Sequence, residues 1–364
     1  MKIRIAALAL AAVLLLPGCS AMLSRSYQMV SPHPDLPSTE EDSSVIRVET
    51  YQELVNAVLY FVSQSVEHGV VRLINYNQDV EADLTRACLE VAKDDPLGAY
   101  AVDFIKHDYT RVVTNYEANI YITYRRTAEQ IRSLVNVTGS SAIRQELQEA
   151  LSSFATEVAL RVGYFAEDEA YIASLVRQAY YDTPTAALGM PQVTVSLYPQ
   201  EGSQRIVEIL LTYAEDPETL RAKQSATLTA AQRLTSPFNG LSSPTSRLSA
   251  LLTALPQNLA YAETGEDGTA PSTAWDALVL GRADDEGLAL AFRLLCDLIG
   301  VECTVAEGTL DGAPHFWNIL YEDSDAPRCV DLSREEPPQS YTGDAFASMG
   351  YLSGGEAAAS DSGA

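Results

Sequence analysis

Apolar and polar residues follow two different periods along the first part of the chain, and these periods separate predicted helices from predicted strands. From Thr50 to Glu67 apolar residues recur at helical spacing, and Thr50 and Glu53 stand in the relation of a capping box. In residues 99–113 and 116–126, Tyr, Ile and Val occupy alternate positions, which is typical of β-strands. The same patterns predict helices over residues 79–96, 141–163 and 167–181, and strands over residues 70–77, 192–199 and 205–216. This mixture predicts an α+β fold.

A weak repeat links the two halves of this region. Asp94-Asp95-Pro96 follows a helical segment and precedes a pair of strand segments, and Asp182-Thr183-Pro184 does the same further along the chain. The arrangement indicates two helix–turn–hairpin units of roughly ninety residues each. We therefore assign residues 46–235 to an N-terminal α+β domain, formed as one domain or as a pair of related lobes.

A second domain is predicted after the Ser-, Pro- and Gly-rich stretch Thr235–Ser246, which is the expected boundary. Residues 247–262 have a helical pattern. Residues 285–299 carry an acid at the start and almost no polar residue on any face, and Gly300 follows the last turn, as is typical of a buried central helix. Three strand segments come next, at residues 301–308, 315–323 and 328–333.

The first residues of the chain have the pattern of an export signal. Lys2 and Arg4 precede an apolar run that is too short to span a bilayer comfortably. The run ends in Leu16-Pro17-Gly18-Cys19, which resembles a bacterial lipobox, in which the cysteine thiol is acylated and the chain is cleaved before it. We therefore predict a signal peptide over residues 1–18 and a lipid on Cys19, which places the mature protein outside the cytoplasm and on the cell membrane. An ordinary cleavable signal with an incidental cysteine is the alternative.

The mature chain is strongly acidic. Removal of Lys2 and Arg4 with the signal changes the net charge from −25 to −27. Such a surface repels phosphate backbones and anionic lipid, so we expect neither nucleic acid as a partner nor a peripheral membrane patch. Attachment to the membrane is expected through the lipid alone. Residues 19–45 are predicted to form a flexible tether, and residues 353–364 a disordered tail.

Four further cysteines, Cys88, Cys296, Cys303 and Cys329, lie in apolar surroundings. The sequence has no CxxC pair and no Cys/His cluster, so we expect no metal and no cofactor. Export permits disulfides, so a Cys296–Cys303 bridge and buried free thiols both stay open.

Asp285, His315 and Asp331 are the candidate reactive residues. Asp285 begins the central helix, where free N–H groups and the helix dipole favour negative charge. His315 and Asp331 belong to the second and third strand segments. If these strands are antiparallel neighbours on the helix, the three side chains meet at one edge of the sheet, in the layout of a cysteine–histidine–aspartate triad.

A series of short motifs surrounds these residues. In order, they are Trp275-Asp276-Ala277, Gly281-Arg282-Ala283, Gly287-Leu288-Ala289, Gly300-Val301, His315-Phe316-Trp317-Asn318 and Val330-Asp331. On these motifs, residues 245–351 resemble the transglutaminase-like superfamily, whose papain-like α+β members include amide-forming transferases, peptidases and bacterial surface proteins. The resemblance implies that residues 236–352 form a domain with a central helix packed on an antiparallel sheet. It also implies that Trp317, Asn318 and Trp275 contact a substrate, although Trp317 on a strand fits a core position as well.

The chain departs from this family at the nucleophile. Family members have a cysteine where this chain has Asp285, a tyrosine is usual at Leu288, and Ser333-Arg334 replaces a frequent Thr-Trp. Acyl transfer in the family needs a thiolate beside an imidazolium, whereas a carboxylate is a poor nucleophile toward amides. The thiol chemistry is therefore predicted to be lost.

Three interpretations of the remaining site stay open. Asp285 acts only as a helix N-terminal acid; or His315, protonated between two carboxylates, lines a cleft that binds a ligand without turning it over; or the three residues bind a divalent metal or run another hydrolysis. The sequence thus predicts a membrane-anchored surface lipoprotein whose degenerate domain binds or scaffolds peptide or cell-wall material. The alternative is an active transglutaminase-like or cysteine-peptidase-like enzyme that uses a non-standard catalytic group.

Overall fold

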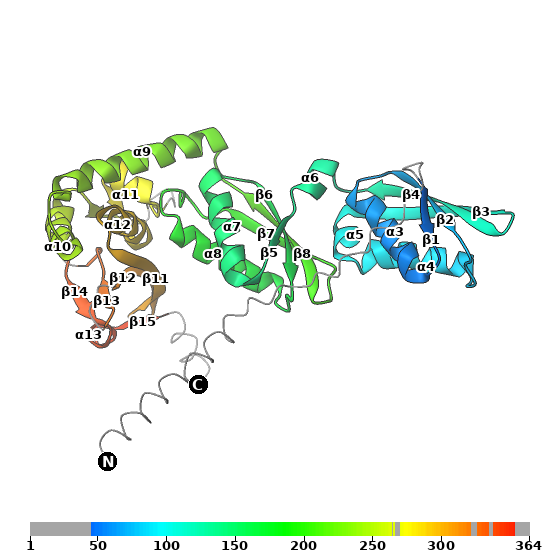
Figure 1. The fold of residues 1–364 in the computed structure, drawn as a ribbon. Helices are drawn as coiled ribbons and strands as arrows, with labels where there is room; N and C mark the ends of the chain where they lie inside the picture. The colour runs from blue at the N-terminus through cyan, green and yellow to red at the C-terminus, as the bar shows by residue number, and fades with distance from the viewer. Residues whose placement is uncertain (1–44, 264, 266–269, 322–325, 335–337, 354–364) are drawn as a thin grey trace, which may run out of the picture. The chain divides into compact units, whose positions relative to one another are not determined.

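The computed structural model describes residues 45–263, 265, 270–321, 326–334 and 338–353. The predicted signal peptide, Cys19, the tether up to residue 44 and the tail from residue 354 lie outside these residues. Helices and sheets are both abundant, so the α+β prediction is confirmed (Figure 1).

The chain divides into two compact units. Of the described residues, the first comprises those within 45–61, 66–88 and 106–121, and the second comprises those within 62–65, 89–105 and 122–353. The main hydrophobic core lies in the second unit and includes residues from Val137 to Val330. Residues before and after the stretch Thr235–Ser246 therefore share one core, and the predicted domain limits stay a prediction.

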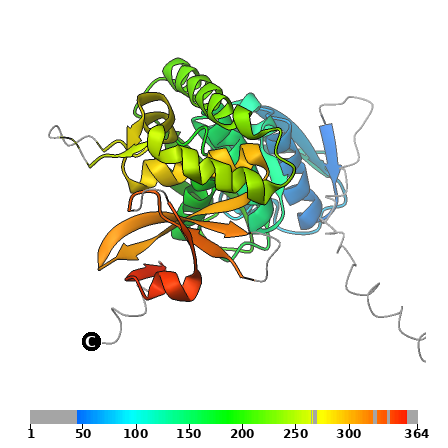
Figure 2. The same ribbon diagram turned by 90° about the vertical axis from the view of Figure 1, so that its left-hand side faces the viewer.

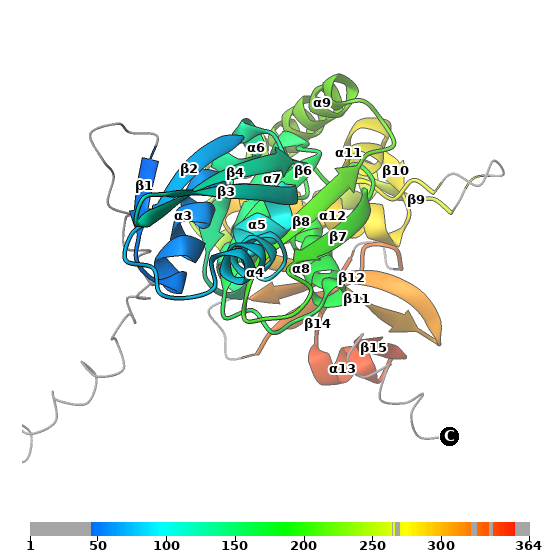
Figure 3. The ribbon, with the colours of Figure 1, turned by 90° about the vertical axis from the view of Figure 1, so that its right-hand side faces the viewer.

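The first sheet has the strand order β1-β2-β4-β3. Its strands are β1 (Val45–Val48), β2 (His68–Leu73), β4 (Asn115–Tyr124) and β3 (Val102–Val112). Strand β1 runs parallel to β2, and β4 runs antiparallel to β2. Helices α3 (Tyr51–Ser63) and α4 (Val80–Lys93) lie on one face of the sheet (Figures 1 and 3). The sequence pattern missed β1 because four residues are too few to establish a period.

The second sheet repeats this order as β5-β6-β8-β7. Its strands are β5 (Val135–Val137), β6 (Glu157–Gly163), β8 (Gln204–Thr212) and β7 (Gln192–Tyr198), and its helices are α6 (Ala128–Arg132), α7 (Gly139–Ser153) and α8 (Glu169–Asp182). The first two strands are again parallel, and the fourth strand in sequence is again antiparallel to the second. Figure 3 shows β7 and β8 in front, with α7 and α8 behind them.

Two sequence expectations in this region need correction. The predicted helix over residues 141–163 ends at Ser153, because Phe154 adopts a left-handed conformation with φ 56°, and β6 follows it. The two Asp-Pro stretches also differ locally. Asp95 caps the short helix α5 (Pro96–Ala101), whereas Asp182 is the last residue of α8. The likeness between the two segments lies in their strand order.

Three helices lead from the second sheet to the last part of the chain. They are α9 (Pro217–Thr235), α10 (Pro244–Ala254) and α11 (Ala274–Leu280), with single 3₁₀ turns after α9 (Ser236–Phe238) and α10 (Leu255–Gln257). Asp216 caps α9 by accepting hydrogen bonds from the Glu218 and Thr219 amides. Helix α9 packs against both α11 and α12, so the second sheet and the last part of the chain belong to one body.

Helix α12 (Asp285–Ile299) is the central element of the last part of the chain. It packs on an antiparallel sheet of order β14-β13-β12-β11-β15. Those strands are β14 (Ser340–Thr342), β13 (Arg328–Val330), β12 (Ala313–Tyr321), β11 (Glu302–Leu310) and β15 (Tyr351–Ser353), with the short helix α13 (Gly343–Ala347) between β14 and β15. Figure 2 faces this region, with the orange strands below the helices and α13 in red beneath them.

The apolar pattern of α12 explains its central place. Leu290, Ala291, Phe292 and Leu295 are fully buried, and ten residues of the helix are buried altogether. The helix ends at Gly300, whose φ of 74° lets its amide turn back onto the last carbonyls. A second pairing, between β9 (Ala260–Tyr261) and β10 (Arg282–Ala283), brings the chain past the start of this helix.

The four cysteines among the described residues, Cys88, Cys296, Cys303 and Cys329, are buried free thiols. Of the two alternatives for Cys296 and Cys303, the structure therefore has the free thiols.

Candidate functional site

The start of α12 is built around two adjacent aspartates. Asp284 caps the helix by accepting a hydrogen bond of 2.9 Å from the Gly287 amide, and it also accepts one from the Ser272 hydroxyl. Only glycine fits at position 287, because a Cβ atom there would lie 2.7 Å from the Pro271 carbonyl oxygen. Asp285, the first residue of the helix, is directed toward the sheet, where it accepts a hydrogen bond from the Phe316 amide on β12.

Asp285, His315 and Asp331 meet as the sequence predicts. His315 Nδ1 lies 2.7 Å from Asp285 Oδ2, and His315 Nε2 lies 2.7 Å from Asp331 Oδ2. The Phe316 amide donates to the same Asp285 oxygen at 2.9 Å. All three side chains are largely shielded from water: 12% of His315, 19% of Asp285 and 5% of Asp331 is exposed. The imidazole ring is therefore held between two carboxylates.

Asp331 has two further partners that fix its orientation. Its Oδ1 accepts hydrogen bonds from the amide and the hydroxyl of Ser333, at 2.8 and 2.7 Å. Its Oδ2 accepts one from the Tyr351 hydroxyl at 2.6 Å, in addition to the contact with His315. A carboxylate surrounded by donors in this way is stabilised in its charged form.

Asp285, His315 and Asp331 stabilise one another in their charged forms. Burial lowers the pKa of His315, but the hydrogen bonds and charges of Asp285 and Asp331 outweigh burial and raise this pKa to about 9. Burial raises the pKa of both aspartates, yet the hydrogen bond from His315 and the other donors hold the pKa of each below its ordinary value. At neutral pH the cluster is therefore an imidazolium between two carboxylates, with a net charge of −1.

This arrangement limits the chemistry of the site. An imidazolium uses both ring nitrogens as donors, and here both already have acceptors. A general base needs an unprotonated nitrogen within reach of the proton that it removes. His315 has none at neutral pH, so in this state it cannot activate a hydroxyl, a thiol or a water.

A second acidic group lies beside this cluster and is buried by α8. The Tyr181 hydroxyl donates a hydrogen bond of 3.0 Å to Glu286 Oε1. Burial raises the pKa of Glu286 to about 7, although the bond from Tyr181 opposes the shift. The Tyr181 ring lies against the Phe316 ring, with centroids 5.7 Å apart. On the same side, Arg177 Nε donates to Glu307 at 2.8 Å, so α8 contacts both the start of α12 and strand β11.

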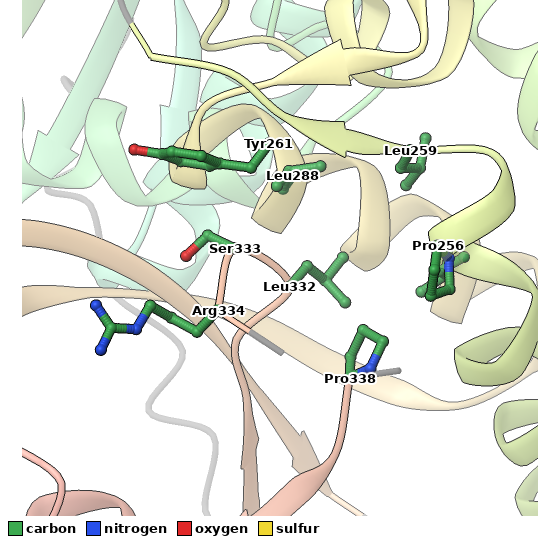
Figure 4. A pocket seen from close by; sticks show the side chains of 9 residues that line it. Pro256, Leu259, Tyr261, Leu288, Leu332, Ser333, Arg334 and Pro338 are labelled. Atoms are coloured by element: carbon green, nitrogen blue, oxygen red, sulfur yellow. The ribbon is translucent and has the colours of Figure 1, made fainter. Parts of the chain in front are cut away.

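A cavity of about 270 Å³ opens next to Asp331. Its polar lining residues are Tyr261, Ser333 and Arg334, and its apolar ones are Leu255, Pro256, Leu259, Leu288, Leu332 and Pro338. Figure 4 shows the two hydroxyl groups and the guanidinium at one end, and Pro256, Leu259 and Pro338 at the other. Ser333 links the cavity to the cluster of Asp285, His315 and Asp331, because its hydroxyl donates a hydrogen bond to Asp331.

The three residues predicted to contact a substrate do not line this cavity. Trp317 is 4% exposed and packs on Phe346 and Tyr351 in a small core beneath the sheet. Asn318 is fully enclosed and donates to the Ala289 carbonyl oxygen at 2.9 Å, which ties β12 to α12. Trp275 is half-buried, with Lys223 Nζ 4.7 Å from its ring centroid.

The residues that sequence reasoning missed are those that donate hydrogen bonds to Asp331 and those that line the cavity. Ser333 follows Asp331 by two positions, a spacing at which a side chain can close a local turn, so it left a recognisable signal. Tyr351 and Tyr261 lie 20 and 70 residues from Asp331, and only the fold brings them near. Within the described residues, no group of three or more His, Cys, Asp or Glu side chains has a geometry that could hold a metal ion.

Comparisons with known proteins give distant structural matches. No protein-family model matches the sequence, and no curated protein is significantly similar to it. A crystal structure described as that of a TGase overlaps 67% of this chain and 68% of its own, at 13% identity and a TM-score of 0.27. A candidate protease from Parabacteroides distasonis ATCC 8503 overlaps 65% of this chain and 57% of its own, at 10% identity and a TM-score of 0.23. Sequence identities and TM-scores as low as these do not define a family.

Proposed function

We propose that this chain is an exported lipoprotein whose C-terminal part is a transglutaminase-like domain that binds peptide or cell-wall material without turning it over. The observation that carries the proposal is the double engagement of His315, whose two ring nitrogens each lie 2.7 Å from a carboxylate. A histidine held in this way is a fixed cation. It offers no base to an attacking group.

The domain assignment rests on the order of the motifs and on where their residues lie. Asp285 occupies the start of a buried helix, where a nucleophile would be exposed to free N–H groups and to a neighbouring imidazole. His315 lies on β12, and Asp331 directly follows β13, the antiparallel neighbour of β12. The scaffold of a triad is thus complete apart from the thiol, and the cavity beside it offers space for a ligand.

The membrane attachment rests on Leu16–Cys19 at the end of the apolar leader. Among the described residues, no helix has the length and apolarity that a membrane span requires. A radiolabelled fatty acid supplied to producing cells should co-purify with the protein and should be absent from a Cys19→Ala variant. Equal or absent label in both proteins would remove the lipid from the proposal.

The binding proposal is tested by activity and affinity measured together. The purified mature chain and its His315→Ala variant are assayed for amide hydrolysis and amine incorporation on a mixed peptide library. The same library is screened for binding through the Tyr261 and Ser333 amide signals in NMR spectra. We expect no turnover by either protein and saturable binding by the native chain. Turnover that disappears in His315→Ala would show an enzyme, and a library without any binder would end the proposal.

A further inference from the structure

The described residues that line the cavity carry charge of one sign. Among them, Arg334 is the one with a formal charge, and none is acidic. Arg334 is exposed, and no ion pair of its guanidinium is present among the described residues. In a chain of net charge −25, a cation at a cavity mouth selects for an anionic group on a ligand, since the rest of the surface repels anions.

The two hydroxyl groups at the polar end have different roles. Ser333 donates its only hydroxyl proton to Asp331 at 2.7 Å, so toward the cavity it can only accept. Tyr261 is half-exposed, and burial, followed by the nearby charge of Asp285, raises its pKa, so its hydroxyl stays protonated. Tyr261 can therefore donate to a ligand. The polar end of the cavity thus presents a cation, a donor and an acceptor (Figure 4).

The other end of the cavity is apolar, and the cavity as a whole is small. Its total volume of about 270 Å³ equals the space of about nine waters in the liquid, which suits one amino-acid residue and not a folded surface. Pro256 and Leu332 are partly exposed in the walls of the cavity, so they offer contact to an aliphatic side chain and no hydrogen-bonding side chain.

Resting on the binding function proposed above, we infer that the cavity holds the C-terminal residue of a peptide, with its free carboxylate on Arg334. Tyr261 donates a second hydrogen bond to this carboxylate, and Ser333 Oγ accepts one from the amide N–H of the same residue. Its aliphatic side chain lies between Pro256 and Leu332. These three polar groups match a peptide terminus in charge and in hydrogen-bonding capacity.

In this arrangement, the cluster of Asp285, His315 and Asp331 positions the Ser333 side chain that contacts the ligand. Asp331 determines the direction of the Ser333 hydroxyl, and His315 keeps Asp331 charged. Because the cluster carries a net charge of −1 behind Ser333, the carboxylate of the ligand is placed at Arg334 and the amide N–H at Ser333. Ser333 thus acts as a positioning residue for the peptide backbone.

The test uses the mature chain and two probes that differ at one end. Calorimetry measures the affinity for N-acetyl-Gly-Gly-Leu as the free acid and as its carboxamide. We expect the acid to bind about tenfold more tightly, since a charge-assisted pair is lost in the amide. Arg334→Gln should remove this difference, and Arg334→Lys should retain part of it. Ser333→Ala should weaken the acid and the amide by the same factor.

Three outcomes separate this inference from the binding function on which it rests. Equal affinity for acid and amide, both abolished by Leu332→Trp in the cavity wall, would overturn the carboxylate contact and leave the binding function in place. Binding of other library peptides without any binding of the acid would do the same. A library without binders would end both proposals. Thermal melting of each variant shows that a loss of affinity comes from the cavity and not from unfolding.

Discussion

His315 Nε2 and Asp331 Oδ2 lie 2.7 Å apart, and this contact has the layout of the last two members of a catalytic triad. In a working triad, the other ring nitrogen faces a nucleophile and accepts its proton. Here that nitrogen faces Asp285 at the same distance and donates to it. One residue at the start of α12 therefore decides whether the ring acts as a base or as a fixed cation.

The first prediction concerns the protonation of His315. Its ring should titrate with a midpoint near 9, because two carboxylates accept from it. Long-range ¹H–¹⁵N NMR spectra should show both nitrogens protonated at neutral pH. The His315 signals are identified by their absence in His315→Asn.

Asp285→Asn supplies the control for this titration. Loss of one negative neighbour should move the midpoint of His315 from about 9 toward its ordinary value of 6.5. A neutral imidazole at pH 7 in the native chain would contradict the description of the cluster as an imidazolium between two carboxylates.

The second prediction restores a thiol at the start of α12. In Asp285→Cys, the new cysteine lies beside an imidazole and at a helix N-terminus, and both features favour the thiolate. Iodoacetamide should label this variant about tenfold faster at pH 7 than the double variant Asp285→Cys with His315→Ala. The native chain is a suitable blank, because it carries the same Cys19 and because Cys88, Cys296, Cys303 and Cys329 are buried. Equal rates in the single and double variants would mean that His315 does not influence position 285.

Much of the site was predictable because it follows from local patterns. An apolar run with an acid at its start identifies a buried helix and its first residue, Asp285. The strands that carry His315 and Asp331 are short, alternate and close in sequence, so their antiparallel pairing is the simplest arrangement.

The rest depends on contacts between distant residues. Tyr351 reaches Asp331 only because β15 pairs with β11, and Tyr181 reaches Glu286 across 105 residues of sequence. Trp317 shows a different limit. An aromatic residue beside a strand histidine has the same pattern whether it faces a substrate or a core, and here the residues around Phe346 enclose it. The end of α7 depended on the backbone at Phe154, since a left-handed phenylalanine leaves no sequence signal.

The third prediction concerns the donors around Asp331. Asp331→Asn places an amide NH₂ group among groups that donate, and it leaves the charged His315 with one carboxylate. We expect a loss of about 3 kcal/mol in the free energy of unfolding, measured by urea denaturation. Tyr351→Phe removes one hydrogen bond of 2.6 Å to the same carboxylate and should cost about 1 kcal/mol. If Asp331→Asn costs no more than Tyr351→Phe, the carboxylate is not the centre of this network.

The fourth prediction concerns the dependence of stability on pH at Glu286. The folded chain raises the pKa of this group from 4.5 to about 7, so the folded state retains a proton that the unfolded state releases between these values. The stabilising contribution is therefore complete below pH 4.5 and is lost as the pH rises through 7. The shift corresponds to about 3 kcal/mol at most.

Glu286→Gln isolates this contribution because the amide is neutral at every pH. His315 titrates in both proteins, so its own loss of stability, which runs from pH 6.5 to about 9, cancels in the difference between them. Relative to the native chain, Glu286→Gln should gain stability steadily between about pH 5 and 7 and hold a constant advantage above that range. Glu302→Gln removes an exposed carboxylate of β11 that has no ion pair among the described residues, and it controls for the loss of charge alone. Parallel stability curves for the native chain and Glu286→Gln would mean that Glu286 titrates alike in both states, and that its burial beneath Tyr181 has no energetic consequence.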